Sequence, residues 1–293
     1  MIRPLDAAAM RAVRAALAED AAGQDVTTVW TVPAELRLTG RVEARAAGTV
    51  AGLGVVAEVY RQLDPDVVVR ADVEDGERVE SGDVVLTIDG PGRSIVTGER
   101  VALNFLQRMS GIATAASAYV DEVRDLRVTI LDTRKTAPGL RELDKYAVVC
   151  GGASNHRRDL AAMVLAKENH LAAAGGVGPA IDAIRRNVAG LGGEQPQIEV
   201  EVTSLEQARQ ALERQVDWVL LDNMSPQDMR TAVDLRDGDP RFRATRLEAS
   251  GNVTLATVRS IALTGVDAIS VGALTHSPDA LDLSLLVQVP QTT

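Results

Sequence analysis

Between residues 128 and 272, short apolar stretches alternate with amphipathic helical stretches, and no other feature limits the fold as much. Helices are predicted near 177–190, 204–215, 226–236 and 254–264, and Ser204, Ser225 and Thr254 stand where N-caps are expected. Repeated strand–helix units form a parallel sheet, and six or more of them suggest an α/β barrel. The predicted strands are VTILDT (128–133), MVLAK (163–167), QIEVEV (197–202), WVLLDN (218–223), RLEASG (246–251) and DAISVG (267–272).

The first part of the chain has a different pattern. Residues 5–20 and 98–124 have apolar side chains at helical spacing, so each is predicted to be a helix. Residues 29–98 alternate Val with polar residues around turn sequences, which predicts an antiparallel sheet with a helix over 55–64. The stretch VEDGERVESGDVVLTIDG resembles half of a biotinyl or lipoyl carrier motif. A carrier needs a lysine at a hairpin tip, and no lysine precedes Lys135, so we exclude that function.

Composition excludes several classes of partner. The formal net charge of −10 disfavours nucleic acid and anionic membranes, and 2% aromatic residues leave few side chains for stacking on bases. No apolar run approaches the ~18 residues of a membrane span. Cys150 is the only cysteine, so no internal disulfide can form, and we expect a cytoplasmic protein.

A cationic stretch nevertheless lies in the middle of this acidic chain. Residues 131–170 hold seven Lys and Arg against five Asp and Glu, together with His156 and His170. Local positive charge on an acidic protein predicts a pocket for a small polyanion, not a nucleic-acid surface. No His–carboxylate spacing indicates a zinc site.

Each predicted strand ends in a residue suited to binding or catalysis. In a barrel these carboxyl ends converge on one mouth, although loops are polar in any protein. Glu199 and Glu201 share one face of their strand, so both should point inward and need a cation, for which Lys167 is the candidate. Asp222 adds a third acid, and such a cluster can hold ribose hydroxyls or Mg²⁺. The strand-end residues are Arg134, Lys135, Lys167, Glu201, Asp222, Ser250 and Gly272.

Several longer motifs resemble the quinolinate phosphoribosyltransferase family. They are ALAEDAAGQDVTT (16–28), GERVALNFLQRMSGIAT (98–114), TRKTAPGLR (133–141), KYAVVCGGASNHR (145–157), KENH (167–170), EVEVTS (199–204), LLDNMSP (220–226), EASGN (248–252) and GVDAISVGALTHS (265–277). They cover nearly the whole chain in the family's order. Three positions depart from it: Gln24 stands for Gly, Ala153 for a third Gly, and Glu168 for Asp.

The resemblance implies an N-terminal α/β sandwich at 1–114, an open seven-stranded α/β barrel at 115–276, and a segment near 277–293 that packs back on the sandwich. It also implies a homodimer in which Arg100 of one subunit reaches the active site of the other. The reaction would join quinolinate and phosphoribosyl pyrophosphate, in the presence of Mg²⁺, to give nicotinate mononucleotide, pyrophosphate and CO2.

The resemblance also implies roles for individual residues. Lys135, Glu201 and Asp222 would be catalytic, with Glu201 and Asp222 organising Mg²⁺, directly or through water. Quinolinate, a dianion, would be bound by Arg100, Arg134, His156, Arg157 and Lys167, which suits the preference of arginine for carboxylates. Phosphoribosyl pyrophosphate would be bound by Lys135, Glu201, Asp222, Ser250, Gly251 and Gly272.

Three alternatives remain open at this point. A sister phosphoribosyltransferase would use nicotinate or another ring acid and would need fewer cations around the ring. A non-catalytic relative would bind a phosphorylated ligand as a sensor, which the presence of Lys135, Glu201 and Asp222 disfavours. A nucleic-acid-binding module is disfavoured by charge and by the scarcity of aromatic residues.

Overall fold

The computed structural model describes residues 7–190, 192–193 and 195–288, and the chain divides into two compact units. The first unit comprises Met1–Ser117, Thr136–Gly152 and Ala273–Thr293, and the second comprises Ala118–Lys135 and Ala153–Gly272. The sequence predicted a domain boundary between residues 114 and 115, and that boundary stays a prediction. Residues 5–6 of the predicted first helix, and 289–293 of the C-terminal segment, lie outside the described residues.

The first unit is built on a four-stranded antiparallel sheet in the order β12 (Leu283–Gln288), β1 (Arg37–Ala44), β5 (Val84–Pro91) and β3 (Val68–Ala71). Every second residue of β1 is buried, as expected for a sheet with one face on the core. Helices α1 (Ala7–Glu19) and α3 (Leu53–Leu63) belong to the same unit and confirm the predicted helices. A two-stranded ladder joins β2 (Gly48–Thr49) to β4 (Arg78–Val79). The short helices η1 (Ala22–Gln24) and α2 (Val26–Thr31) were not predicted.

Helix α4 (Gly92–Val123) begins six residues earlier than the predicted start at residue 98. Gly92 and Gly98, near its start, are positions of close packing. A Cβ on Gly98 would lie 2.6 Å from Cε1 of Tyr60, so the glycine lets the ring pack against the helix. Ile95 is fully buried and continues the apolar spacing of the helix toward its N-terminus.

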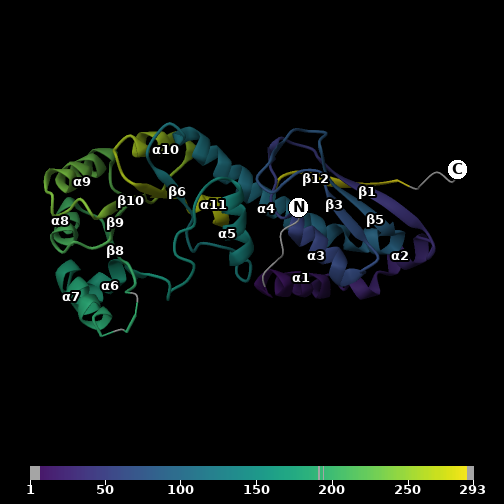
Figure 1. Ribbon diagram of the computed structural model, residues 1–293, viewed down its shortest axis with the longest axis horizontal. Helices are drawn as coiled ribbons and strands as arrows, with labels where there is room; N and C mark the ends of the chain where they lie inside the picture. Colours follow the sequence, from purple (N-terminus) through teal and green to yellow (C-terminus); the bar gives the residue numbers. More distant parts are fainter. Residues whose placement is uncertain (1–6, 191, 194, 289–293) are drawn as a thin grey trace. The chain divides into compact units, whose positions relative to one another are not determined.

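The second unit contains a six-stranded parallel sheet, and all six predicted strands are confirmed (Figure 1). Its order is β6 (Thr129–Leu131), β11 (Ala268–Ser270), β10 (Arg246–Ser250), β9 (Trp218–Asp222), β8 (Ile198–Val202) and β7 (Val164–Ala166). The seventh strand implied by the resemblance is reduced to a single parallel bridge between Ser154 and Leu131. This ladder ends early because the N–H of His156 donates to the Asp132 carboxylate at 2.7 Å instead of to a backbone carbonyl.

Helices follow the strands of this unit as predicted: α7 (Val177–Val188), α8 (Leu205–Glu213), α9 (Pro226–Gly238) and α10 (Leu255–Ala262). The side chains of Ser204 and Ser225 accept the backbone N–H groups of Gln207 and Asp228, which confirms two of the predicted caps. Figure 1 shows α8, α9 and α10 on the outer side of β8, β9 and β10. Three further helices were not predicted: α5 (Arg141–Cys150), α6 (Glu168–Ala174) and α11 (Ala273–His276). None of the helices that the structure describes has the length and apolar character to cross a membrane.

Candidate active site

The carboxyl ends of four neighbouring strands bring together the charged residues that the sequence singled out. Ala166 is opposite Val200, so Lys167, the next residue, is level with Glu201. Ser250 at the end of β10 is directly opposite Asp222 at the end of β9. These residues therefore occupy one edge of the parallel sheet, where ligands of α/β folds bind.

Lys167 and Glu201 form an ion pair at this edge, which confirms the predicted pairing. The Glu201 side chain is largely buried, with 13% of its surface exposed, whereas that of Lys167 is 47% exposed. The backbone N–H of Lys167 donates to Nδ1 of His170 at 3.0 Å, so His170 helps to begin α6 and fixes the backbone that carries Lys167. The ammonium group stays accessible to a ligand.

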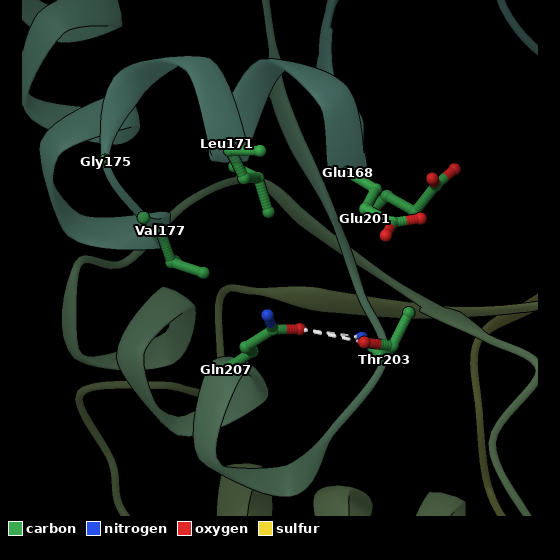
Figure 2. A pocket seen from close by; sticks show the side chains of 9 residues that line it. Glu168, Leu171, Gly175, Val177, Glu201, Thr203 and Gln207 are labelled. Carbon is green, nitrogen blue, oxygen red and sulfur yellow. Dashed lines mark hydrogen bonds between the residues drawn. The ribbon is translucent and has the colours of Figure 1, made fainter.

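A hollow of about 240 Å³ adjoins Glu201 between α6, α7 and α8. Figure 2 shows the Glu201 and Glu168 side chains on one side of it and Gln207 on the other. The Gln207 side-chain oxygen accepts both the N–H and the hydroxyl of Thr203, so the turn after β8 is held in place. This hollow extends the polar edge beyond the strand ends.

Glu199 has a different partner from Glu201. Its Oε2 lies 3.0 Å from Nε2 of His156, and Oε2 of Glu248 lies 3.4 Å from the same nitrogen. Glu199 and Glu248 are buried, and Oε1 of each has no hydrogen-bond partner among the described residues. Glu248 was missed in the sequence, although it alternates with Ser250 on β10 as Glu199 does with Glu201 on β8.

The pKa values of His156 and Glu199 are both raised above their usual values. Burial raises the pKa of Glu199, and the nearby Glu248 carboxylate raises it further. Burial lowers the pKa of His156, but its hydrogen bonds to Glu199 and Glu248 outweigh that effect and raise it to about 10. Nε2 of His156 lies 3.0 Å from Glu199 and 3.4 Å from Glu248, so the proton that it carries is held between the two carboxylates.

The same three residues are the one cluster of potential metal ligands within the described part of the chain. A histidine that binds a metal through Nε2 normally donates from Nδ1. Here Nε2 of His156 instead carries a proton held by Glu199 and Glu248, so it has no lone pair to offer a metal, which disfavours a metal at this cluster. Glu201 and Asp222 are not part of it.

The loop after β6 carries Arg134 and Lys135. Nε of Arg134 is buried and has no hydrogen-bond acceptor among the residues described, so a bound anion would satisfy it. Lys135 is exposed, and its N–H donates to the Thr133 hydroxyl at 3.0 Å. The loop thus presents one cation whose Nε is buried and one exposed cation.

Gly251 makes a close approach at the end of β10. Its φ is +94°, and a Cβ there would lie 2.2 Å from Oδ1 of Asn223. That oxygen accepts the Asn252 side-chain amide at 2.9 Å, while Asn223 donates to the Asp222 carboxylate at 2.7 Å. The glycine therefore allows the loops after β9 and β10 to pack closely together beside Asp222. Gly272 follows β11 by two residues, at the same edge of the sheet.

Two predicted residues have other surroundings. Arg157 donates to the backbone carbonyl of Met163 at 3.1 Å and lines a cavity at the amino ends of the strands. Arg100 is an exposed residue of α4 in the first unit.

Comparison with known proteins identifies the family. The quinolinate phosphoribosyl transferase N-terminal domain matches residues 25–110, and the C-terminal domain of the same enzyme matches residues 112–286. The chain is 44% identical to the nicotinate-nucleotide pyrophosphorylase [carboxylating] of Mycobacterium leprae, over 95% of this chain and 96% of that one. It is 41% identical to quinolinate phosphoribosyltransferase [decarboxylating] 1b of Nicotiana tabacum, over 94% and 81% of the two chains.

Solved structures agree with this assignment. The nicotinate-nucleotide pyrophosphorylase of Francisella tularensis superimposes with a TM-score of 0.88 at 36% identity, over 98% of both chains. The human nicotinic acid phosphoribosyltransferase has a TM-score of 0.52 at 16% identity, which shows only a likeness of fold. The chain belongs to the quinolinate phosphoribosyl transferase family and is a phosphoribosyltransferase.

Proposed function

We propose that this protein converts quinolinate and phosphoribosyl pyrophosphate to nicotinate mononucleotide, pyrophosphate and CO2 in de novo NAD biosynthesis. The observation that carries the proposal is the polar edge of the parallel sheet, which holds the Lys167–Glu201 ion pair and Asp222, in a chain matched by both family domains.

The proposed ring-acid site is cationic because quinolinate carries two adjacent carboxylates. The buried, unsatisfied Nε of Arg134 supports it, since a carboxylate would accept that N–H. Lys167 adds an exposed ammonium, and His156 has its Nε2 proton between two carboxylates. For Arg157 to contribute, its guanidinium must exchange the Met163 carbonyl for a ring carboxylate.

The proposed sugar-phosphate site uses the strand ends. Glu201 and Asp222 accept the ribose hydroxyls, while Lys135 and the Ser250–Gly251 turn bind phosphate, with Gly272 allowing close approach of the backbone. Two carboxylates without nitrogen or sulfur ligands suit Mg²⁺, which prefers oxygen and keeps several waters. When bound there, Mg²⁺ would neutralise charge on the departing pyrophosphate.

The chemistry then needs positioning and electrostatics more than a protein nucleophile. The pyridine nitrogen bonds to ribose C1 as the bond from C1 to the pyrophosphate oxygen breaks. Glu201 and Asp222 stabilise the positive charge that develops on the ribose ring. The bond between ring C2 and its carboxylate breaks next, the electron pair stays at C2 beside the positively charged nitrogen, and a proton replaces CO2.

We also propose that the enzyme is a homodimer in which Arg100 acts on the partner's site. Its support is that Arg100 is exposed and that its side chain makes no ion pair or hydrogen bond with other described residues. Mixing inactive Arg100→Ala and Lys135→Ala proteins, with subunit exchange, should restore about one quarter of wild-type activity, because mixed dimers keep one intact site. No recovery in a mixture shown to exchange subunits would contradict the shared site.

We propose a cytoplasmic location, because Cys150 is the only cysteine and no internal disulfide can form. Cell fractionation tests it. Recovery of the native protein in an organelle would contradict it.

The decisive experiment offers purified protein, Mg²⁺ and phosphoribosyl pyrophosphate with either quinolinate or nicotinate, and measures nicotinate mononucleotide and CO2. We expect product from quinolinate and none from nicotinate. Product from nicotinate alone would retain the sugar site but contradict the double-carboxylate pocket. No consumption of phosphoribosyl pyrophosphate with either acid would favour a sensor.

A further inference from the structure

A second cavity lies at the end of the parallel sheet opposite to the candidate active site. Its volume is about 610 Å³, and residues at the amino end of every strand line it. The active site uses the carboxyl ends of the same strands, so the two open toward opposite ends of the sheet, although His156 and Arg157 of the proposed ring-acid site also line this cavity. The strand-start residues are Thr129, Met163, Gln197, Trp218, Arg246 and Ala268.

The lining of this amino-end cavity is cationic. Arg127, Arg157 and Arg246 line it, and neither Arg127 nor Arg246 has an acidic partner among the described residues. The acid at its rim, Asp267, is already occupied, because its carboxylate accepts both Arg236 at 2.5 Å and the backbone N–H of Leu247 at 2.7 Å. An anion could therefore bind the guanidinium groups of Arg127 and Arg246 without displacing an acidic side chain.

An aromatic ring stands beside the cations. The guanidinium carbon of Arg246 lies 5.3 Å from the centre of the Trp218 ring, which is partly exposed. Deeper in the lining, Glu248 is 1% exposed, and its Oε1 has no partner among the described residues. The cavity thus combines guanidinium groups, an aromatic face and a buried acceptor that lacks a donor.

We propose that the amino-end cavity binds a nucleoside phosphate, as a site separate from catalysis. The phosphate would pair with Arg127 and Arg246, which offer the planar donor arrays suited to phosphate. The base would stack on Trp218, as bases do on exposed aromatic side chains. A ribose hydroxyl or an amino group of the base would donate to Oε1 of Glu248.

Each part of this ligand is needed to match the lining. Inorganic phosphate would leave Trp218 and Glu248 without partners, and an uncharged nucleoside would leave the arginines without an anion. A volume of about 610 Å³ also lies within the ~300–1,000 Å³ range of small-molecule pockets.

The test uses the fact that Trp30 and Trp218 are the only tryptophans. In full-length Trp30→Phe protein, all tryptophan fluorescence comes from Trp218. Titration with AMP should give a saturable change in fluorescence, and adenosine should bind about tenfold more weakly because it lacks the phosphate. Inorganic phosphate should compete with AMP only weakly, because it engages the arginines alone.

Three substitutions in the Trp30→Phe background locate the site. Arg127→Gln and Arg246→Gln should each weaken AMP binding about tenfold, while turnover with quinolinate stays unchanged. Arg209→Gln is the matched control, since Arg209 is an exposed arginine of α8, paired with Glu206 and Glu213, that does not line the cavity. It should leave AMP binding unaltered.

The outcomes separate this proposal from the proposed catalytic function. AMP binding in Lys135→Ala protein that has lost turnover supports a distinct site. Displacement of AMP by quinolinate would show that the cavity belongs to the ring-acid pocket, to which His156 and Arg157 are assigned, and would overturn the proposal. So would the absence of any AMP-dependent change up to about 5 mM, or equal AMP affinity in Arg246→Gln.

Discussion

The buried cluster of His156, Glu199 and Glu248 makes the stability of the fold depend on pH. The carboxylates raise the pKa of His156 to about 10 from its usual 6.5, and burial raises that of Glu199, so the folded state binds more protons than the unfolded chain. The stability that this cluster contributes is therefore fully present below pH 6.5 and is lost as pH rises toward 10. We expect the free energy of unfolding to fall between pH 6.5 and 9 in chemical denaturation.

Glu199→Gln should flatten that pH dependence, because the amide keeps the shape of the side chain and removes its charge. Glu206→Gln is the control: Glu206 is exposed on α8, and hydrogen bonds from Arg209 and Gln210 lower its pKa, so it does not titrate in this range. An unchanged slope in Glu199→Gln would show that the cluster does not take up the proton.

At the carboxyl edge, single residues should affect catalysis with little effect on folding. Lys135→Ala and Glu201→Ala are expected to lower kcat/KM at least about 100-fold, since they remove charges that act on the transition state. Lys135 is exposed, and the Lys167–Glu201 pair is partly exposed, so thermal unfolding should change little. Arg186→Ala, an exposed residue of α7, is the control. Wild-type turnover in either variant would refute its assigned role.

How much of this site the sequence predicted depends on whether a residue lies in a strand. Alternation along β8 was enough to place Glu201 inward and to pair it with Lys167 on the neighbouring strand. The partner of Glu199 was out of reach, because His156 lies in a loop held by a side chain, Asp132, whose bonding no periodicity encodes.

At the scale of the elements, the packing of the loops after β9 and β10 requires glycine at one position. Gly251→Ala would place a methyl group 2.2 Å from Oδ1 of Asn223, at a φ of +94° that strains any side chain. We expect a loss of about 1–3 kcal/mol in the free energy of unfolding. KM for phosphoribosyl pyrophosphate should also rise, because Asn223 holds the Asp222 carboxylate.

Gly238→Ala is the matched control, because it ends α9 with open space around it and no positive φ. Denaturant unfolding and initial-rate kinetics on both variants test this account. Equal behaviour of the two alanine variants would contradict it.

Element boundaries show where local patterns stop being informative. All six strands of the parallel sheet were predicted to within two residues at either end, since each is a short apolar run between helices. The start of α4 was placed six residues late because Gly92, its first residue, packs closely against Leu38 of β1, a contact with no local signature. The seventh strand implied by the resemblance was not assigned to residues, and the structure has one bridge at Ser154, because a family resemblance carries topology but not ladder length.

On the scale of the whole molecule, the first unit is completed by the last strand of the chain. β12 pairs with β1 along Thr39 to Ala44, and the backbone carbonyl of Leu283 accepts the Gln107 side chain at 2.8 Å. These contacts join residues that are well over a hundred positions apart, and the residues of the second unit fall between them in the sequence. Contacts at such separation form late, after a large loop-closure cost.

Leu283 anchors that strand, being 2% exposed, whereas Leu286 on the same strand is 42% exposed. Leu283→Asp buries a charge without a partner and should release β12, so that amide hydrogen exchange accelerates in β1. Exchange in β8 and β9 should stay slow, because those strands belong to the second unit. Leu286→Asp places the same charge in solvent and should leave β1 protected. Equal exchange in the two variants would mean that the last strand does not stabilise the N-terminal sheet, while faster exchange throughout Leu283→Asp would mean that both units unfold together.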